Sequence, residues 1–205
     1  DYVPDTQDRI GSIGFNRTLA SFYGRLNYDY QSKYLFAATI RRDGSSLFAP
    51  GYQWGTFPSF SAGWVLSNEK FFSNSNISKT INYAKIRASW GQNGSLSSVG
   101  LGEWMNSISA GALYPDGSGT FIVGAYPTSI ANPELTWETS EQLDLGLEMA
   151  FMSNRLNLTV DYYIKKTKDL LTGGVAPLFV GNIVRTVNAG NVENKGLEVE
   201  LSYKN

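Results

Sequence analysis

Hydrophobic and polar residues alternate along two neighbouring stretches of the chain, residues 143–151 and residues 156–164. The hydrophobic set of the first stretch is Leu143, Leu145, Leu147, Met149 and Phe151, and that of the second is Leu156, Leu158, Val160, Tyr162 and Ile164. Because successive side chains of a β-strand point to opposite faces, this period of two predicts two strands with one apolar face each. Residues 152–155 form a short break between them.

The same alternation recurs in five further stretches, so the sequence predicts seven strands. These stretches are residues 19–30, 34–40, 59–66, 84–91 and 197–203. The central part of each apolar face carries no charge. Charged residues in the apolar register fall at one end of their strands only; examples are Arg42, Glu141, Lys166 and Lys195.

The length of the strands favours a transmembrane β-barrel. A strand that crosses an apolar band roughly 25 Å tall at a tilt of about 40° needs about 9–11 residues. The fold class is therefore predicted as all-β, a section of a transmembrane antiparallel β-barrel. The alternative is a soluble all-β carbohydrate-binding module, because the strands of a sandwich also alternate. The two differ in what covers the apolar faces, which is lipid in a barrel and a second sheet in a sandwich.

The connections between the predicted strands alternate between short and long. Residues 31–33 and 152–155 are short, whereas residues 43–57, 92–136 and 165–188 are long. Outer-membrane barrels have short periplasmic turns and long extracellular loops, which assigns the short turns to the periplasm. An aromatic girdle is expected near that rim, formed by Tyr28, Tyr30, Tyr34, Phe36, Phe151 and Tyr203. Residues 67–82 are longer than a usual periplasmic turn, and their composition fits a loop or a short helix.

Composition excludes several classes of function. A formal net charge of -1 at pH 7 gives no basis for nucleic-acid binding. The chain has no cysteine and no histidine, so it has no nucleophilic thiol and no histidine general base or metal ligand. Glu198 and Glu200 share one face without a cleft or metal motif, and glycosidase chemistry is not expected from them. We expect no enzyme activity, no catalytic residue, no metal and no cofactor.

Six motifs extend over nearly the whole chain. They are Arg-Arg-Asp-Gly-Ser-Ser at 41–46, Phe-Pro-Ser-Phe-Ser-Ala-Gly-Trp at 57–64, Lys-Ile-Arg-Ala-Ser-Trp-Gly-Gln-Asn-Gly at 85–94, Asn-Pro-Glu-Leu-Thr-Trp-Glu at 132–138, Asp-Tyr-Tyr at 161–163 with Lys-Thr-Lys-Asp-Leu-Leu at 166–171, and Asn-Ala-Gly-Asn-Val-Glu-Asn-Lys-Gly-Leu-Glu at 188–198. This series closely resembles the SusC/RagA-type TonB-dependent transporters of Bacteroidetes outer membranes.

The resemblance implies a 22-stranded barrel with a plug, in the cell outer membrane. It also implies import of glycan or peptide fragments, with a SusD-like surface lipoprotein as lid and a TonB-type protein as energy supply. Residues 1–205 are expected to form part of the TonB-dependent receptor β-barrel domain, about seven of its strands, in contact with outer-membrane lipid. The plug and the TonB-contacting segment have no counterpart in the sequence, so we expect a fragment from the C-terminal half of the barrel.

Two groups of residues are candidates for substrate binding. Arg41, Asp43, Lys85 and Arg87 are candidates to line the substrate path near its mouth, and the alternative is that they form ion pairs between strands. Tyr52, Trp54 and Trp104 are expected in outer loops, where aromatic rings stack on sugar faces. The alternative for these three is packing within the loops or contact with the lid. Trp104, Tyr114 and Tyr126 of the long loop are expected to contact cargo or lid.

Overall fold

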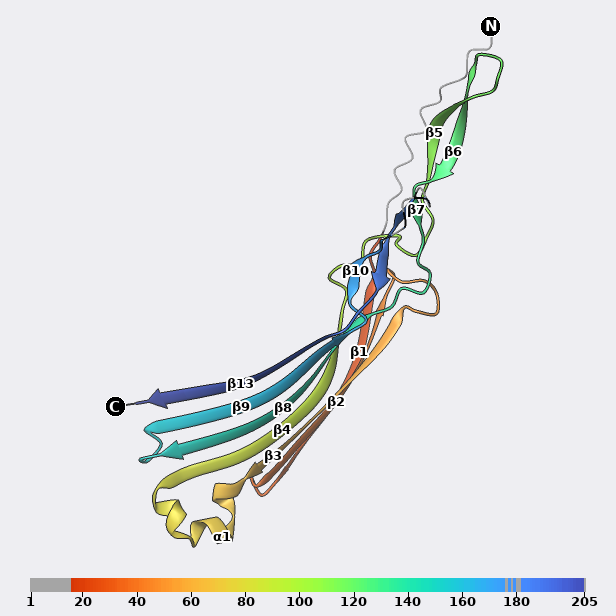
Figure 1. Ribbon diagram of the computed structural model, residues 1–205. Helices are drawn as coiled ribbons and strands as arrows, with labels where there is room; N and C mark the ends of the chain where they lie inside the picture. The colour runs from red at the N-terminus through yellow and green to blue at the C-terminus, as the bar shows by residue number, and fades with distance from the viewer. Residues whose placement is uncertain (1–15, 176, 178, 180–181, 205) are drawn as a thin grey trace.

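One antiparallel sheet of seven strands forms the body of the protein. The computed structural model describes residues 16–175, 177, 179 and 182–204. The strand order is β1-β2-β3-β4-β8-β9-β13, so the seven strands of this sheet pair in the order in which they occur along the chain. The bounds are β1 Leu19–Tyr30, β2 Tyr34–Ser45, β3 Trp54–Val65, β4 Ile81–Ser95, β8 Glu138–Phe151, β9 Leu156–Lys168 and β13 Val192–Tyr203. The sheet is long and curved (Figure 1), which confirms the prediction.

Smaller elements lie at the two ends of this sheet. The end with the short connections, here called the turn end, holds three short helices between β3 and β4: η1 Leu66–Asn68, α1 Lys70–Ser73 and η2 Asn76–Lys79. Residues 67–82 are therefore mainly helical. Among the described residues, no helix is long and apolar enough to cross a membrane.

The opposite end, called the loop end, carries short strands within the long connections. Strands β5 (Ile108–Pro115) and β6 (Phe121–Pro127) form a hairpin that projects far beyond the sheet (Figure 1). Beneath it, β7 (Ser129–Ile130) pairs with β11 (Ile183–Val184), and β10 (Leu171–Gly173) pairs with β12 (Thr186–Asn188). The long connections are thus partly ordered as strands.

The register keeps apolar and polar positions separate across all seven strands. One row of paired residues reads Tyr28, Phe36, Ala62, Ala88, Leu145, Tyr162 and Leu197. The adjacent row reads Asn27, Ala37, Ser61, Ser89, Asp144, Tyr163 and Gly196. We call the face of the first row the outer face and that of the second the inner face. A slip of one residue in any strand would mix the two sets.

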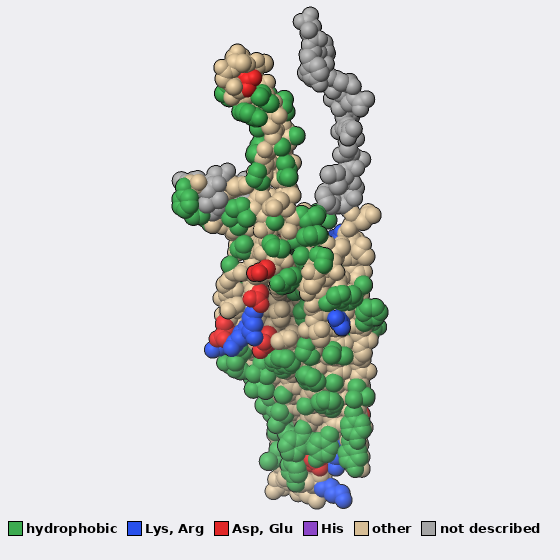
Figure 2. All heavy atoms as spheres, turned by 90° about the vertical axis from the view of Figure 1, so that its right-hand side faces the viewer, with side chains coloured by type: hydrophobic (Ala, Val, Ile, Leu, Met, Phe, Trp, Pro, Cys, Tyr) green, Lys and Arg blue, Asp and Glu red, His purple; other side chains and the backbone are tan. Residues whose placement is uncertain are grey.

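Large apolar side chains of the outer face are exposed. Leu26, Leu145 and Leu201 are 62%, 49% and 66% exposed. Figure 2 shows hydrophobic side chains covering much of the surface over the strands. In the described residues no second sheet packs on this face, since the other sheets are two-stranded ribbons at the loop end. The soluble sandwich is therefore wrong, and the outer face requires lipid around it.

Most strands are longer than predicted, mainly toward the loop end. Strand β2 extends to Ser45, β9 extends to Lys168 and β13 begins at Val192. The alternation identified only those parts of the strands that carry an apolar face. Pairing continues beyond it because backbone hydrogen bonds do not require an apolar side chain on one side.

The two short turns depend on left-handed backbone. Gln31 and Ser32 have φ of 54° and 52°, and Met152, Ser153 and Asn154 have φ of 54°, 58° and 67°. Residues other than glycine seldom adopt this conformation. Side chains support both turns: the Ser32 N–H donates to Asp29 Oδ1 at 2.7 Å, and the Ser153 N–H donates to Asn82 Oδ1 at 2.7 Å.

A small hydrophobic core joins the long connections at the loop end. This loop core consists of Phe48, Phe57, Leu135, Trp137 and Leu171, all buried. The Trp137 ring centroid lies 5.4 Å from that of Phe48 and 5.6 Å from that of Phe57. The Trp137 indole N–H also donates to the backbone oxygen of Gln53 at 3.1 Å. The loops are therefore held on a packed base, which the alternating pattern of the sequence does not predict.

The opposite orientation of adjacent residues in β8 gives a direct test. Leu145→Arg places a cation on the lipid side and is expected to destabilise the protein by roughly 2–4 kcal/mol, the cost near the middle of a bilayer. Asp144→Arg stays on the wet inner face and is expected to cost much less. Both variants are compared in the full-length protein in lipid by denaturant titration. A larger loss for Asp144→Arg would contradict the assignment of the faces.

Candidate substrate path on the inner face

An ion-pair network occupies the inner face nearer the turn end. This Arg87 network consists of Lys85 and Arg87 on β4, Glu148 on β8 and Asp161 on β9. Arg87 Nη2 lies 2.7 Å from both Oδ1 and Oδ2 of Asp161. Arg87 Nε lies 3.1 Å and Lys85 Nζ 3.5 Å from Glu148 Oε1. The Nε–H is buried and is not aligned for a hydrogen bond, so its attraction to Glu148 is electrostatic only. Two cations and two carboxylates balance each other's charge.

Gly146 makes this network possible. In the register of the sheet Arg87 pairs with Gly146, and Gly146 pairs with Asp161. The Arg87 side chain crosses over β8 at this glycine, where a Cβ atom would overlap both Arg87 and Asp161. A similar close approach occurs where the Tyr163 ring lies over Gly196. Glycine in the polar register of a strand thus marks a place where a long side chain lies across the sheet.

A polar hollow continues along the inner face toward the loop end. Asp144 on β8 lines this hollow together with Arg25, Asn27, Thr39, Ser61, Ser89, Gln142 and Lys165. Asp144 accepts hydrogen bonds from Gln142 Nε2 at 2.8 Å and Ser89 Oγ at 3.3 Å. These groups suit a ligand rich in hydroxyl or amide groups. In the described part of the chain, no three acidic, histidine or cysteine side chains gather where they could hold a metal ion.

The four charged candidates lie at two separate levels. Arg41 Nε lies 2.8 Å from Asp43 Oδ1 near the loop end, and Asp43 is buried. In the register of the sheet, Arg87 on β4 is level with Gly63 on β3 and with Leu35 on β2. Leu35 lies six residues closer to the turn end than Arg41 does on the same strand. Lys85 and Arg87 are therefore not near the mouth, and the four residues do not form one site. Lys85 and Arg87 form ion pairs between strands, as the alternative interpretation expected, whereas the Arg41–Asp43 pair lies within β2.

The three aromatic candidates also separate. Trp54 begins β3, pairs with Gly44 and belongs to the outer face, so its expected place in an outer loop is wrong. Its ring lies 6.1 Å from that of Phe22, and the Arg42 guanidinium lies 5.3 Å from its centroid. The outer-face register continues as far as Trp54, which places this ring at the outer rim. Tyr52 and Trp104 do lie in loops, where Tyr52 is exposed and Trp104 half-buried.

The hairpin β5–β6 carries Tyr114 and Tyr126 away from the sheet. Both are about half exposed, and Ile108, Leu113, Phe121 and Val123 are each more than 60% exposed on the same two strands. At its tip, the Ser118 hydroxyl and backbone N–H donate to Asp116 and hold the pKa of that carboxyl below its ordinary value. An exposed apolar ribbon of this kind is typical of a surface that a partner covers.

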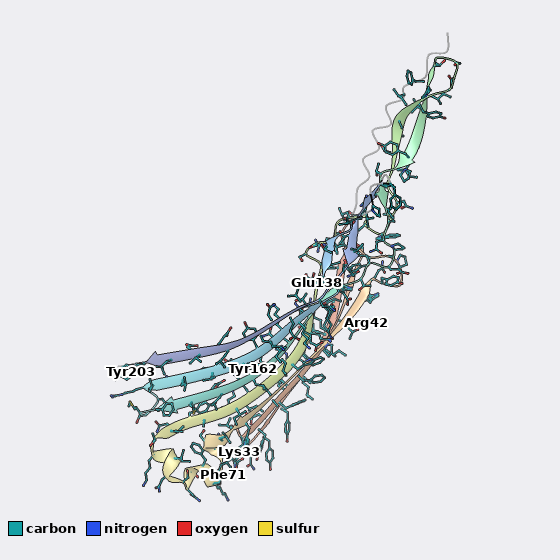
Figure 3. The ribbon with its side chains drawn as sticks, in the orientation of Figure 1. Lys33, Arg42, Phe71, Glu138, Tyr162 and Tyr203 are labelled. Atoms are coloured by element: carbon teal, nitrogen blue, oxygen red, sulfur yellow. The ribbon has the colours of Figure 1, made fainter. Side chains whose placement is uncertain are left out.

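Glu69 connects the short helices at the turn end to strands β2 and β3. It accepts hydrogen bonds from the Tyr34 hydroxyl at 2.8 Å, Lys33 Nζ at 3.2 Å and Trp64 Nε1 at 3.3 Å. The Tyr34 and Lys33 bonds lower the pKa of the Glu69 carboxyl. Figure 3 shows Lys33 and Phe71 together at this end, with Arg42 and Glu138 toward the loop end. The predicted girdle included Tyr34, but no pattern in the sequence indicated its acidic partner.

Comparison with known proteins identifies the family. Residues 1–204 match the protein family described as "TonB dependent receptor-like, beta-barrel". The chain belongs to this family. TonB-dependent receptor P3 of Formosa agariphila is 40% identical over 187 residues, which are 91% of this chain and 18% of that protein. TonB-dependent receptor SusC of Bacteroides thetaiotaomicron is 34% identical over 194 residues, again 91% and 18%.

Solved structures agree with this assignment. The RagAB peptide importer in the "closed-closed" state matches with a TM-score of 0.77 and 26% identity, over 91% of this chain and 20% of that one. The siderophore receptor PirA of Pseudomonas aeruginosa shares the fold alone, with a TM-score of 0.57 at 18% identity. The chain spans about a fifth of the length of the SusC and RagAB proteins. The resemblance to SusC/RagA proteins is therefore confirmed. The TonB-dependent receptor family consists of outer-membrane proteins that are not enzymes, and this chain is an outer-membrane protein.

The crossing of Arg87 over β8 predicts that Gly146 is sensitive to a single methyl group. Gly146→Ala forces Arg87 and Asp161 apart and is expected to destabilise the full-length protein by about 1–3 kcal/mol, the range for overpacking. Gly24→Ala is the matched control, because nothing lies within 4 Å of a Cβ atom there. Denaturant unfolding in lipid measures both. Equal effects of the two substitutions would show that Arg87 does not need Gly146.

Proposed function

We propose that this chain forms part of the wall of an outer-membrane active transporter that imports oligosaccharide or peptide fragments. The observation that carries the proposal is the division of the sheet into an exposed apolar outer face and a hydrogen-bonding inner face. The TonB-dependent receptor family and the relationship to SusC support import as the activity. The chain itself is the barrel section, and we assign energy coupling to a TonB-type protein that contacts another part of the transporter.

The inner face supports a cargo that is recognised by hydrogen bonds. The Arg87 network balances its own charge, and Asn27, Ser61 and Ser89 offer neutral hydrogen-bonding groups beside it. Arg25, Asp144 and Lys165 line the same wall and are in no ion pair among the described residues. Hydroxyl groups of a sugar and backbone groups of a peptide both fit such a surface. Tyr52 and Trp104 are proposed cargo contacts at the loop end. The similarity to the RagAB peptide importer supports the peptide alternative.

The hairpin β5–β6 is proposed as the contact for a SusD-like surface lipoprotein. It projects past the loop core, and its apolar side chains have no cover within the described residues. An apolar surface of this length is costly to leave in water and is stabilised when a partner covers it. Binding of the lipoprotein there would close the loop end over the cargo.

Removal of this hairpin tests the proposal. Replacing Ile108–Pro127 by a short Gly/Ser turn leaves the loop core in place, because none of its members lies in that range. Uptake of labelled cargo by cells is expected to fall by roughly tenfold or more, the effect of losing about 1.4 kcal/mol of binding free energy. Heat-modified gel mobility checks that the barrel still assembles.

Point substitutions refine this experiment. Phe121→Ser combined with Val123→Ser keeps the hairpin length but removes two exposed apolar side chains, and co-purification of the lipoprotein is expected to fall with uptake. Asp116→Asn at the tip is the control and should change neither. Normal uptake and normal co-purification after loss of the hairpin would refute the proposed contact.

A further inference from the structure

Five charged residues gather on the outer face of β8, β9 and β13. This outer charged patch consists of Glu141, Lys166, Lys168, Glu193 and Lys195. Glu141 pairs with Lys166 in the sheet, and Lys166 pairs with Glu193, so they form one row across three strands. All five occupy the register that carries apolar residues farther down the same strands. Charge in this register needs an explanation, because the outer face below it contacts lipid.

The patch lies at the height of the lipid headgroups. On β9 the outer-face residues from Leu156 to Ile164 are apolar or aromatic, and Lys166 follows ten residues after Leu156. At about 3.4 Å per residue and a tilt of about 40°, Lys166 stands about 26 Å above Leu156, which is the full height of the apolar band. The Trp90 indole N–H donates to Glu141 at 3.2 Å and marks the same boundary. Figure 2 shows basic and acidic side chains gathered beside and above the hydrophobic part of this surface.

The carboxylates fix the lysines without using all of their hydrogen-bond donors. Lys168 Nζ lies 2.7 Å from Glu141, and Lys166 and Lys195 Nζ lie 3.0 Å and 2.6 Å from Glu193. Each ammonium group has three N–H donors, and one of these ion pairs occupies about one of them. The three lysine side chains are 46–53% exposed, and three cations against two carboxylates leave a net positive charge. The patch therefore presents positioned donors toward the outer leaflet.

An apolar hollow adjoins the charged groups. It is lined by Trp90, Leu143 and Ile164, together with Glu141 and Lys166 at its upper edge. An amphipathic lipid that places its headgroup at the lysines would lay an acyl chain against these apolar residues. The arrangement of donors above and apolar surface below matches the layout of one lipid molecule at the boundary of the bilayer.

We propose that the outer charged patch binds the phosphate groups of a phosphorylated glycolipid in the outer leaflet, with an acyl chain against Leu143 and Ile164. Lys166, Lys168 and Lys195 donate to the phosphate oxygens, and Glu141 and Glu193 hold these lysines in place. This site faces away from the inner wall, so it does not depend on what cargo passes. Its occupant stabilises β8, β9 and β13 at the level where the apolar face ends.

The test uses the full-length transporter that contains this chain, purified in detergent. Bisphosphorylated lipid A and the same lipid without phosphates are added separately, and retained lipid is measured by native mass spectrometry. The wild-type protein is expected to retain the phosphorylated form. Combined substitution Lys166→Gln, Lys168→Gln and Lys195→Gln is expected to reduce retention roughly a hundredfold, since each lysine near an anionic headgroup contributes a factor of about five. Lys70→Gln with Lys79→Gln, at the turn end, is the control and retains the lipid.

Three outcomes overturn the proposal. The wild-type protein retains the dephosphorylated lipid equally well, or the triple variant retains as much phosphorylated lipid as the wild type. The third is that the wild-type protein associates with a second copy and the triple variant does not, with the lipid content unaltered, which assigns the patch to contact between copies. If the triple variant does not assemble, the comparison of the two lipids on the wild-type protein still decides the matter. Competition by inorganic phosphate separates binding of a free anion from binding of the lipid.

Discussion

The register of the seven-stranded sheet is the constraint on which the other features depend. A strand in a membrane must satisfy its backbone groups through neighbouring strands, and the apolar pattern of one face, together with the turns, then fixes which residues stand side by side. Once Leu145 aligns with Ala88 and Tyr162, the alternation of each strand determines which side chains face lipid and which face water. The outer aromatic rings, the inner ion pairs and the outer charged patch all follow from this alignment.

Packing on the inner face is more constrained than on the outer face. Polar side chains must satisfy one another across strands while they leave a passage, and long residues do so by lying flat. Arg87 reaches Asp161 across Gly146, and Tyr163 covers Gly196 in the same way. The result is a wall on which these long side chains lie across neighbouring strands. Under the proposed function, this wall offers hydrogen-bonding groups along the path of the cargo.

The sequence alone predicted the strand centres because period-two alternation is a local property. The same signal ends where the apolar face ends, so it could not show that β2 continues to Ser45 or β9 to Lys168. The partners of Arg87 could not be predicted either, because register between strands that are distant in sequence depends on the whole sheet. The loop core was missed for a related reason. Trp137 and Phe57 are 80 positions apart, and only the folded connections bring them together.

Trp54 lies in a strand, although the sequence predicts it in a loop. Its position between predicted strands suggests a loop residue that is available to a sugar. The structure instead extends β3 to include it and places its ring on the outer face beside Phe22. The outer face at the loop end therefore includes an aromatic residue outside the alternating stretch. Arg42 above the same ring shows where the apolar face gives way to polar headgroups.

Site-directed spin labelling along β9 tests the division into two faces most directly. The chain contains no cysteine, so single cysteines can be introduced at each position of Leu156–Lys168 in a full-length transporter cleared of other cysteines. Labels at Leu158, Val160 and Tyr162 are expected to be accessible to oxygen dissolved in lipid, and labels at Thr159 and Asp161 to a water-soluble nickel complex. At Lys166 the outer-face label should become accessible to the water-soluble reagent. Accessibility without a period of two, or with the opposite phase, would contradict the account.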